Sequence, residues 1–391
     1  MAGLYIHIPF CKSRCIYCNF YSTTLSSLQD MYVDSLCKEM EIRAEHPNFF
    51  RFEKTELKTI YLGGGTPSLL SKPSFEKIFL YINKVYRPEW GSYSKRSDDK
   101  SPIEVTVECN PDDINDQFCD TIHQLPINRI SMGVQTFDDT RLRFLRRRHT
   151  AKDIQHAIER LRKRGIHNIS IDLIFGFPSQ TIDEWEADLH HALSLDVEHI
   201  SAYSLTYEPG TPLFQMAQGG NITPVDEGLS ADMYDLLINI LTQNGYEHYE
   251  ISNFAKHTTT RDYRSKHNSS YWQDVPYTGI GAAAHSYDLQ TRSWNTADIH
   301  AYIDAIRDGD IPCEAETIDP KTHYNDLITT ALRTREGLSF GKVPAKYKEY
   351  LLANARRHLA TGLLVIEEDR IHLTRKGLFI SDDIMSDLII V

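Results

Sequence analysis

Six short runs of β-branched and aromatic residues alternate with helical stretches along the first half of the chain, and this alternation constrains the fold most. Several of the runs are bounded by Gly, Pro or Asn. The expected strands are Leu4–Ile8, Thr59–Leu62, Glu104–Glu108, Arg129–Gly133, Asn168–Ile174 and His199–Leu205. The expected helices are Leu28–Glu45, Ser74–Val85, Asn115–His123, Ala151–Arg164 and Thr181–Leu193. The alternation predicts an α/β fold of parallel units, and six such units predict an open, partial (β/α)6 barrel of the TIM type.

The second half of the chain changes character near Gly219-Gly220. A helix is expected at Asp226–Gln243, and the polar stretches Gly91–Ser101 and Lys256–Lys266 read as surface loops. The final region is expected to form two helices and a hairpin, at Tyr324–Arg335, Ala345–Thr361, Leu364–Glu367 and Arg370–Thr374. We therefore expect a barrel over residues 1–218, a mixed capping region over 219–312 and a winged-helix-like module over 313–391.

Charge and hydropathy narrow the function classes. The chain has 42 Lys and Arg against 54 Asp and Glu, a net charge of −12, which disfavours a nucleic-acid binder. No apolar run approaches the roughly 18–20 residues that cross a bilayer, and the N-terminus lacks the basic and apolar pattern of a secretory signal. We therefore expect a cytoplasmic protein with no transmembrane segment and no nucleic-acid partner.

Polar or glycine-rich features lie at or near the carboxyl end of each predicted strand, where parallel βα folds place their chemistry. These features are Cys11, Gly63–Pro67, Glu108 with Asn110 and Pro111, Gln135, Asp172 and Thr206. A barrel with a purely structural role would rarely carry such residues at the ends of all six strands. The sequence therefore predicts a site at the carboxyl ends of the strands.

Three cysteines, Cys11, Cys15 and Cys18, lie within eight residues of one another, directly after the first strand. In a reducing compartment such a group indicates a metal site before it indicates disulfides. Thiolates hold iron–sulfur clusters, and three ligands on a four-iron cluster leave one iron open. A zinc site that takes His7 as its fourth ligand is the alternative.

With this cysteine spacing after the first strand, the chain resembles the radical S-adenosylmethionine superfamily. Within it, essentially the whole chain resembles the oxygen-independent coproporphyrinogen III oxidase group. The segments that carry this resemblance are Leu4–Cys11, Gly63–Pro67, Ser131–Gln135 and Ile171–Gly176. The resemblance implies a [4Fe–4S] cluster on Cys11, Cys15 and Cys18, with the open iron binding the amino and carboxylate groups of S-adenosylmethionine.

The resemblance also implies which residues line the S-adenosylmethionine pocket. They are Tyr5, Gly64, Gly65, Thr66, Glu108, Gln135, Arg147, Asp172 and Thr206. Each assignment makes physical sense, since glycine lets a ligand approach the backbone closely and Glu108 can accept hydrogen bonds from the ligand's donors. Without the resemblance, Arg147 would read as part of a solvated basic run.

The group has two branches, the oxidases themselves and a branch of haem chaperones. Oxidases place a further cysteine two residues after the third, where this chain has Phe20, and carry an N-terminal extension, whereas Cys11 lies close to the start here. The element His267-Asn-Ser-Ser-Tyr-Trp272 matches the chaperone branch. These two differences from the oxidases and the His267–Trp272 element favour the chaperone branch. The alternative is an oxidase that decarboxylates coproporphyrinogen III.

We therefore expect a chain that binds haem and passes it to an unidentified acceptor protein, with peripheral contact to membrane haem proteins. His267 is the expected axial ligand, since imidazole commonly holds haem iron, and His285 is its rival. Aromatic residues near His267 offer a flat surface for the porphyrin, and Arg264 and Lys266 are expected to pair with its propionates. The sequence predicts no oligomeric state.

Overall fold

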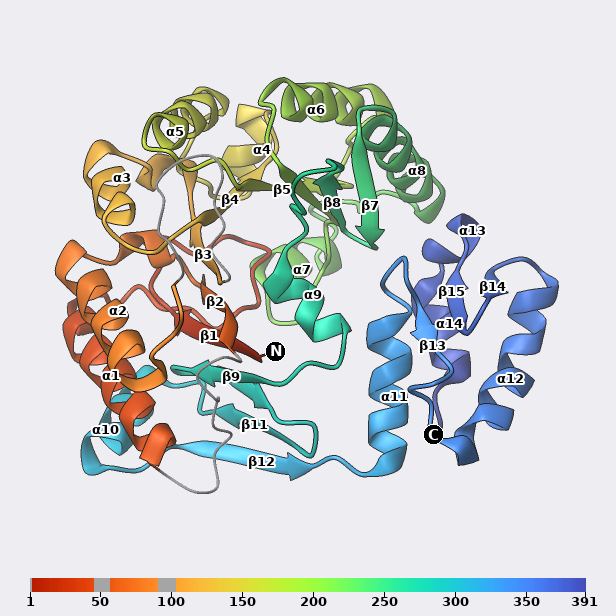
Figure 1. Cartoon of the computed structure of the whole chain (residues 1–391). Coiled ribbons are helices and arrows are strands. Elements are labelled where there is room, and N and C mark those ends of the chain that lie inside the picture. Colours follow the sequence, from red (N-terminus) through yellow and green to blue (C-terminus); the bar gives the residue numbers. More distant parts are fainter. Residues whose placement is uncertain (1, 46–56, 91–102) are drawn as a thin grey trace.

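The computed structural model describes residues 2–45, 57–90 and 103–391 of the chain (Figure 1). The expected loop Gly91–Ser101 lies outside these residues. In the described part of the chain, twelve strands form one large sheet and three short strands form a second. None of the helices described there is long and apolar enough to cross a membrane.

The centre of the large sheet consists of six parallel strands that neighbour one another in chain order. They are β1 (Ala2–Ile8), β2 (Leu57–Gly64), β3 (Glu104–Cys109), β4 (Arg129–Gln135), β5 (Ile169–Phe175) and β6 (His199–Ser204). The helices along them are α1 (Gln29–Glu45), α2 (Lys72–Tyr86), α3 (Asp116–His123), α4 (Asp139–Phe144), α5 (Ala151–Lys163), α6 (Ile182–Ser194) and α7 (Pro212–Gln218). The expected α/β fold with six parallel strands is confirmed.

The sheet continues at both edges with strands that the sequence did not predict. Next to β1 come β9 (Tyr277–Ile280), β10 (His285–Tyr287), β11 (Thr291–Asn295) and β12 (Cys313–Thr317), and next to β6 come β8 (Asn253–Lys256) and β7 (Tyr246–Glu250). Only β9 runs parallel to its neighbour β1, and the others pair antiparallel. The expected loop Lys256–Lys266 ends inside two elements, since Lys256 closes β8 and Lys266 opens α9.

Three helices belong to this middle region, α8 (Glu227–Gln243), α9 (Lys266–Trp272) and α10 (Ile299–Asp308). Helix α8 matches the expected helix, and Asp226 caps it by accepting a hydrogen bond from the Leu229 amide. Helix α9 contains the His267–Trp272 element and contacts β1, β2 and α11. This short helix therefore joins the strand starts to the C-terminal region.

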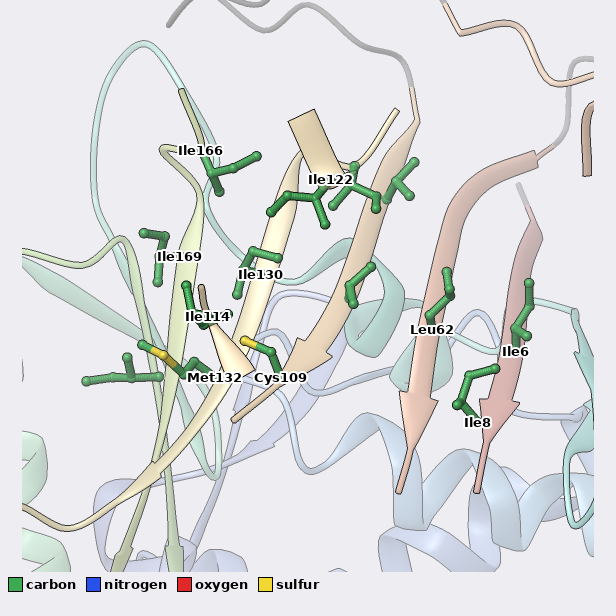
Figure 2. Close-up of a cluster of buried hydrophobic side chains, with 14 of the residues drawn as sticks. Ile6, Ile8, Leu62, Cys109, Ile114, Ile122, Ile130, Met132, Ile166 and Ile169 are labelled. Atoms are coloured by element: carbon green, nitrogen blue, oxygen red, sulfur yellow. The ribbon is translucent and has the colours of Figure 1, made fainter. Parts of the chain in front are cut away.

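The two faces of the parallel strands differ in chemistry because successive side chains alternate across a sheet. One face is aliphatic and packs in the main core, with Ile6 and Ile8 on β1, Leu62 on β2 and Ile130 and Met132 on β4 (Figure 2). The alternate residues on the same strands are polar or aromatic, and several of them contact one another. The polar face is the one that can hold a site.

The C-terminal region has a hydrophobic core of its own. Its elements are α11 (Pro320–Ala331), β13 (Leu338–Ser339), α12 (Ala345–Ala360), β14 (Leu364–Glu367), β15 (Arg370–Leu373), α13 (Arg375–Leu378) and α14 (Ser381–Leu388). The expected hairpin is present as β14 and β15. The helix expected at Tyr324–Arg335 is α11. It begins earlier, at Pro320, because Asp319 caps it there, and it ends at Ala331.

A buried carboxylate, Glu39 on α1, holds the β9–β12 extension against the barrel. Its oxygens accept hydrogen bonds from Arg43 Nε at 2.8 Å, Asn295 Nδ2 at 2.8 Å, Gly281 N at 2.8 Å and Tyr302 OH at 2.6 Å. Glu39 is 0% exposed and Arg43 4%. Breaking a buried ion pair leaves an uncompensated charge, which costs more than the pair itself contributes.

We predict that Glu39→Gln lowers the free energy of unfolding by about 3–5 kcal/mol, because the substitution removes the carboxylate of a buried ion pair. Chemical denaturation followed by circular dichroism measures this. The control is Glu41→Gln on the same helix, whose pair with Lys84 is on the surface, and this control should leave the midpoint unchanged. Equal midpoints for Glu39→Gln and the wild type would contradict the prediction.

Candidate functional site

The three clustered cysteines lie on the loop between β1 and α1, at the carboxyl end of the barrel. The loop is closed at its base by hydrogen bonds from Thr23 N to Pro9 O at 2.7 Å and from Cys11 N to Thr23 O at 2.9 Å. Further along the loop, Ile16 contacts α7 through a hydrogen bond from Leu213 N at 3.0 Å. These bonds fix the path of the chain that carries the thiols.

The donor set fits an iron–sulfur cluster. Cys11, Cys15 and Cys18 are all free thiols and partly exposed. Among the described residues, no three His, Cys, Asp or Glu side chains converge closely enough to hold one metal ion. In a cluster each thiolate binds a different iron atom, so its ligands need not converge on one point. Burial raises the pKa of the Cys11 and Cys18 thiols, and a bound metal would favour their thiolate forms.

His7, the alternative zinc ligand, is used elsewhere. Its Nε2 donates to the Tyr21 carbonyl at 3.0 Å, so its Nδ1 accepts from the Tyr5 hydroxyl at 3.0 Å. Burial lowers the pKa of His7 to about 4, which keeps the ring neutral at physiological pH. With both ring nitrogens occupied, His7 has no free donor for a metal.

The glycine run after β2 packs directly against the cysteine loop. Gly64 has φ +113°, and a Cβ there would lie 2.5 Å from the His7 ring. A Cβ on Gly65 would lie 2.7 Å from the Pro9 backbone, which leads into Cys11. Thr66 donates from its hydroxyl to Cys11 Sγ at 3.6 Å. The run therefore positions the first cysteine, while its Gly64 and Gly65 amides donate to Glu108 and to the Ile8 carbonyl.

Glu108, at the end of β3, reaches across to this run. Its Oε2 accepts from Gly64 N at 3.0 Å, and its Oε1 accepts from the Tyr61 hydroxyl at 2.7 Å. Burial raises the pKa of Glu108 to about 7, although the hydrogen bonds from Tyr61 and Gly64 oppose this rise. A carboxyl group whose pKa lies near neutral pH is partly ionised there, and its ionised form can accept further hydrogen bonds from a cationic ligand.

Gln135 at the end of β4, Asp172 on β5 and Arg147 after α4 form the next part of the site. Gln135 has φ +72°, and a Cβ on Gly133 would lie 2.8 Å from Gln135 Nε2 and 2.9 Å from Arg147 Nη2, so the two side chains meet over this glycine. A left-handed backbone at a residue other than glycine is costly and gathers at functional sites. Asp172 accepts from the Ser131 hydroxyl at 3.5 Å, and burial raises the pKa of its carboxyl.

Arg147 has spare capacity for an anionic group. Its Nη2 donates to the Tyr17 hydroxyl at 3.0 Å, and its Nη1 donates to Asn110. Its buried Nε has no hydrogen-bond partner among the residues that the structure describes. Thr206 is exposed two residues beyond the end of β6, so β6 ends earlier than expected.

His267 lies at the opposite end of the barrel from the cysteines, because its ring contacts Gly3 and Thr59 near the strand starts. It is 1% exposed. Its Nδ1 forms a hydrogen bond with Thr59 Oγ1 at 2.8 Å, and its Nε2 forms one with Tyr271 OH at 2.8 Å. Burial lowers the pKa of His267 to about 3. His267 thus has neither an exposed ring nor an unused nitrogen.

His285, on β10, is exposed, and its ring lies 6.1 Å from that of Trp294 on β11. Arg264, expected to pair with a propionate, instead forms ion pairs with Glu247 at 2.6 Å and with Glu336 at 2.8 Å. Glu336 belongs to the C-terminal region, so Arg264 ties that region to the edge of the sheet. Lys266 is exposed.

The sequence did not reveal Tyr61 and Tyr17 as parts of this site, whereas Asn110 is among the residues expected at the end of the third strand. Each of the three contacts a predicted residue: Tyr61 holds Glu108, while Asn110 and Tyr17 hold Arg147. Tyr17 is adjacent to Cys18 in the sequence, which is a signal that could have found it. Tyr61 reads as an ordinary strand residue.

The fold and this site define the class of protein. Residues 5–192 match the model of the radical SAM superfamily, and residues 318–380 match that of the HemN C-terminal domain. The structure of coproporphyrinogen III oxidase (HemN) from Escherichia coli aligns with a TM-score of 0.79 at 21% identity, covering 99% of this chain and 89% of that one. That likeness shows that the fold includes a HemN-type partial barrel.

Relatives that match along the full chain show to which family within the radical SAM superfamily it belongs. The haem chaperone HemW of Bacillus subtilis is 35% identical over 390 residues, 98% of each chain, and that of Lactococcus lactis is 34% identical over 99% of this chain and 97% of the relative. A mitochondrial radical S-adenosyl methionine domain-containing protein 1 of Mus musculus is 33% identical over 73% of this chain and 60% of the relative. The chain belongs to the HemW family of radical SAM proteins.

We predict that anaerobically reconstituted protein contains about four iron and four sulfide per chain, as a single four-iron cluster requires. Replacing Cys11, Cys15 and Cys18 together by Ala should abolish the iron and the visible absorption. Cys313→Ala, which removes a partly exposed thiol on β12, is the matched control and should retain both. Stoichiometric zinc in the reconstituted protein would contradict this assignment.

Proposed function

We propose that the chain is a haem chaperone built on a radical SAM scaffold, which binds haem and passes it to an acceptor protein. The observation that carries this proposal is the similarity to haem chaperones along 98% of the chain. Phe20 supports it, since this residue is 67% exposed beside Cys18 and supplies no further thiol there. The likeness to the oxidase structure concerns the fold alone.

At the carboxyl end of the barrel, we propose a [4Fe–4S] cluster on Cys11, Cys15 and Cys18 with S-adenosylmethionine beside it. Together these groups supply one-electron chemistry when bound. The protein's part is to bind and orient. The Arg147 Nε would donate to the carboxylate of the ligand, and Glu108 would accept from the N–H bonds of its amino group.

The remaining pocket residues would complete this binding site. Gln135 and Asp172 lie close to Arg147, and the exposed Thr206 lies beyond β6. Tyr5 acts through its hydrogen bond to His7, which packs against Gly64. Gly65 and Thr66 would present the backbone of the run to the ligand while they hold the cysteine loop.

For the haem iron there are two candidate ligands. His267 is the one that the sequence favours, but its Nε2 must first give up the hydrogen bond to Tyr271. His285 needs no such change, because its ring is exposed and has an aromatic neighbour in Trp294. On this geometry we place His285 first, and His267 stays a prediction that the titration below tests.

The rest of the assignment follows from the sequence. We propose the division at residues 1–218, 219–312 and 313–391, with the last region as a winged-helix-like module that packs on the barrel and binds no nucleic acid. A cytoplasmic chaperone of this kind would meet its acceptor in solution or at the surface of a membrane haem protein. The acidic net charge and the free cysteines are consistent with this setting.

We predict that the affinity for S-adenosylmethionine rises about tenfold between pH 6 and pH 8, because a group with a pKa near 7 goes from mostly neutral to mostly ionised over that range. Below its pKa, Glu108 is an uncharged acid and becomes a weaker acceptor for the hydrogen bonds that the ligand's amino group donates. Titration of the reduced cluster, followed by electron paramagnetic resonance, gives the dissociation constant at each pH. Glu108→Gln should bind more weakly and lose the pH dependence, and a flat wild-type profile would contradict the role of Glu108.

We predict that the protein binds about one haem per chain with a shifted Soret band, as axial imidazole ligation requires. His285→Ala should change that band or weaken binding, and His267→Ala should change it less. A spectrum altered only by His267→Ala would restore the sequence-based ligand. Conversion of coproporphyrinogen III to protoporphyrinogen IX by the wild type, under anaerobic, reducing conditions with S-adenosylmethionine, would overturn the chaperone assignment.

A further inference from the structure

Glu108 is held in place from two sides before any ligand arrives. One oxygen accepts from Gly64 N at 3.0 Å and the other from the Tyr61 hydroxyl at 2.7 Å. A carboxylate has about four lone-pair sites, so each oxygen keeps one for a ligand. The Tyr61 hydroxyl therefore decides which way the free lone pairs of Glu108 point.

The ring of Tyr61 is in turn fixed by its neighbours on the inner face of the barrel. It is stacked on His267 with ring centres 4.9 Å apart and an interplanar angle of 22°, and on Tyr5 at 6.2 Å and 28°. A Cβ on Gly63 would lie 2.7 Å from the Tyr61 ring and 3.1 Å from Glu108, so the glycine leaves room for both. Tyr61 cannot move far without displacing one of these rings.

Glu108, Tyr61 and His267 form a line of residues in contact, and hydrogen bonds fix the position of His267 within it. Hydrogen bonds to Thr59 and Tyr271 occupy its two ring nitrogens, and its backbone N–H donates to Glu104 Oε1 at 3.0 Å. Thr59 and Tyr61 lie two residues apart on β2 and so project from the same face. The His267 imidazole is hydrogen-bonded to Thr59 and stacked on Tyr61, so it supports the Tyr61 ring from one side.

We propose that Tyr61 and His267 are positioning residues for S-adenosylmethionine binding, with His267 supporting Tyr61 and Tyr61 orienting Glu108 toward the ligand's amino group. This inference rests on the proposed assignment of Glu108 to S-adenosylmethionine. It gives the His267–Trp272 element a role that does not require haem. The line runs from α9, at the strand starts, to the glycine run at the strand ends.

The charges around Glu108 support this role. The charge of Asp172 influences the Glu108 carboxylate, and Glu108 in turn influences Tyr5, Cys109, Tyr203 and Tyr271; none of these five groups is a cation. The hydroxyl of Tyr61 is the larger of the two hydrogen-bonding influences that lower the pKa of Glu108. Removing it would raise that pKa, so ligand binding should require a higher pH.

The first test uses Tyr61→Phe in the reconstituted full-length protein. We expect the variant to keep its cluster and its ring stacking but to bind S-adenosylmethionine about tenfold more weakly at neutral pH, the scale of one hydrogen bond to a charged group. Its binding profile should also shift to higher pH. Electron paramagnetic resonance of the reduced cluster measures both. Tyr246→Phe, which removes a buried hydroxyl bonded to Val197 O, is the matched control and should behave as wild type.

The second test separates ring support from ligation at His267. His267→Ala leaves a cavity under Tyr61 and should weaken S-adenosylmethionine binding several-fold, whereas His267→Phe retains a flat ring and should stay within about twofold of wild type. Iron content and thermal melts identify any variant that fails to fold. Equal losses in the two His267 variants would overturn the proposed support by the stacked ring.

The outcomes distinguish this inference from the function on which it rests. A wild-type spectrum that does not respond to S-adenosylmethionine, or a Glu108→Gln variant that responds as wild type, would refute the proposed site. If Glu108→Gln binds weakly while Tyr61→Phe and His267→Ala bind as wild type, the site stands and the positioning role is wrong.

Discussion

The structure depends on a polar inner face on the six parallel strands. A closed eight-stranded barrel fills its interior with branched aliphatic side chains, whereas here the inner positions carry Tyr5, Tyr61, Glu108 and Asp172. Buried polar groups are costly unless they find partners, so each must be satisfied by another. The aliphatic residues on the opposite face stabilise the fold, and the mutual hydrogen bonds on the inner face determine where the site can be.

The central strands of the barrel could be predicted from the sequence, because they have strong β-propensity and Gly or Pro residues mark several of their ends. The edge strands could not be predicted in this way, for an equally physical reason. Strand β12, with the sequence CEAET, is mostly exposed and shows no apolar alternation, so only its pairing with β11 makes it a strand. Helix α11 begins four residues before the expected start at Tyr324, because Asp319 caps it and Pro320 occupies its first turn.

The site shows the same division. Cys11, the glycine run and Glu108 were predictable, since unusual residue types follow strands at fixed places. The supporting role of Tyr61 was not, because a tyrosine in a strand is what β-propensity leads one to expect. His267 was singled out correctly as unusual, but its motif says nothing of burial. Only the structure shows that Thr59 and Tyr271 occupy both of its ring nitrogens.

In the proposed assignment, the cofactor site lies at the strand ends and the exposed His285 lies on the antiparallel extension beside β1, near enough for its charge to lower the pKa of His7. A chaperone must also release its cargo, so haem transfer tests the account most directly. Haem-loaded protein is mixed with a haem-free b-type cytochrome, and the acceptor's Soret spectrum is followed over time. The account predicts that the holo-cytochrome spectrum appears while the chaperone's haem band is lost. Haem that stays on the chain in the presence of the empty acceptor would contradict it.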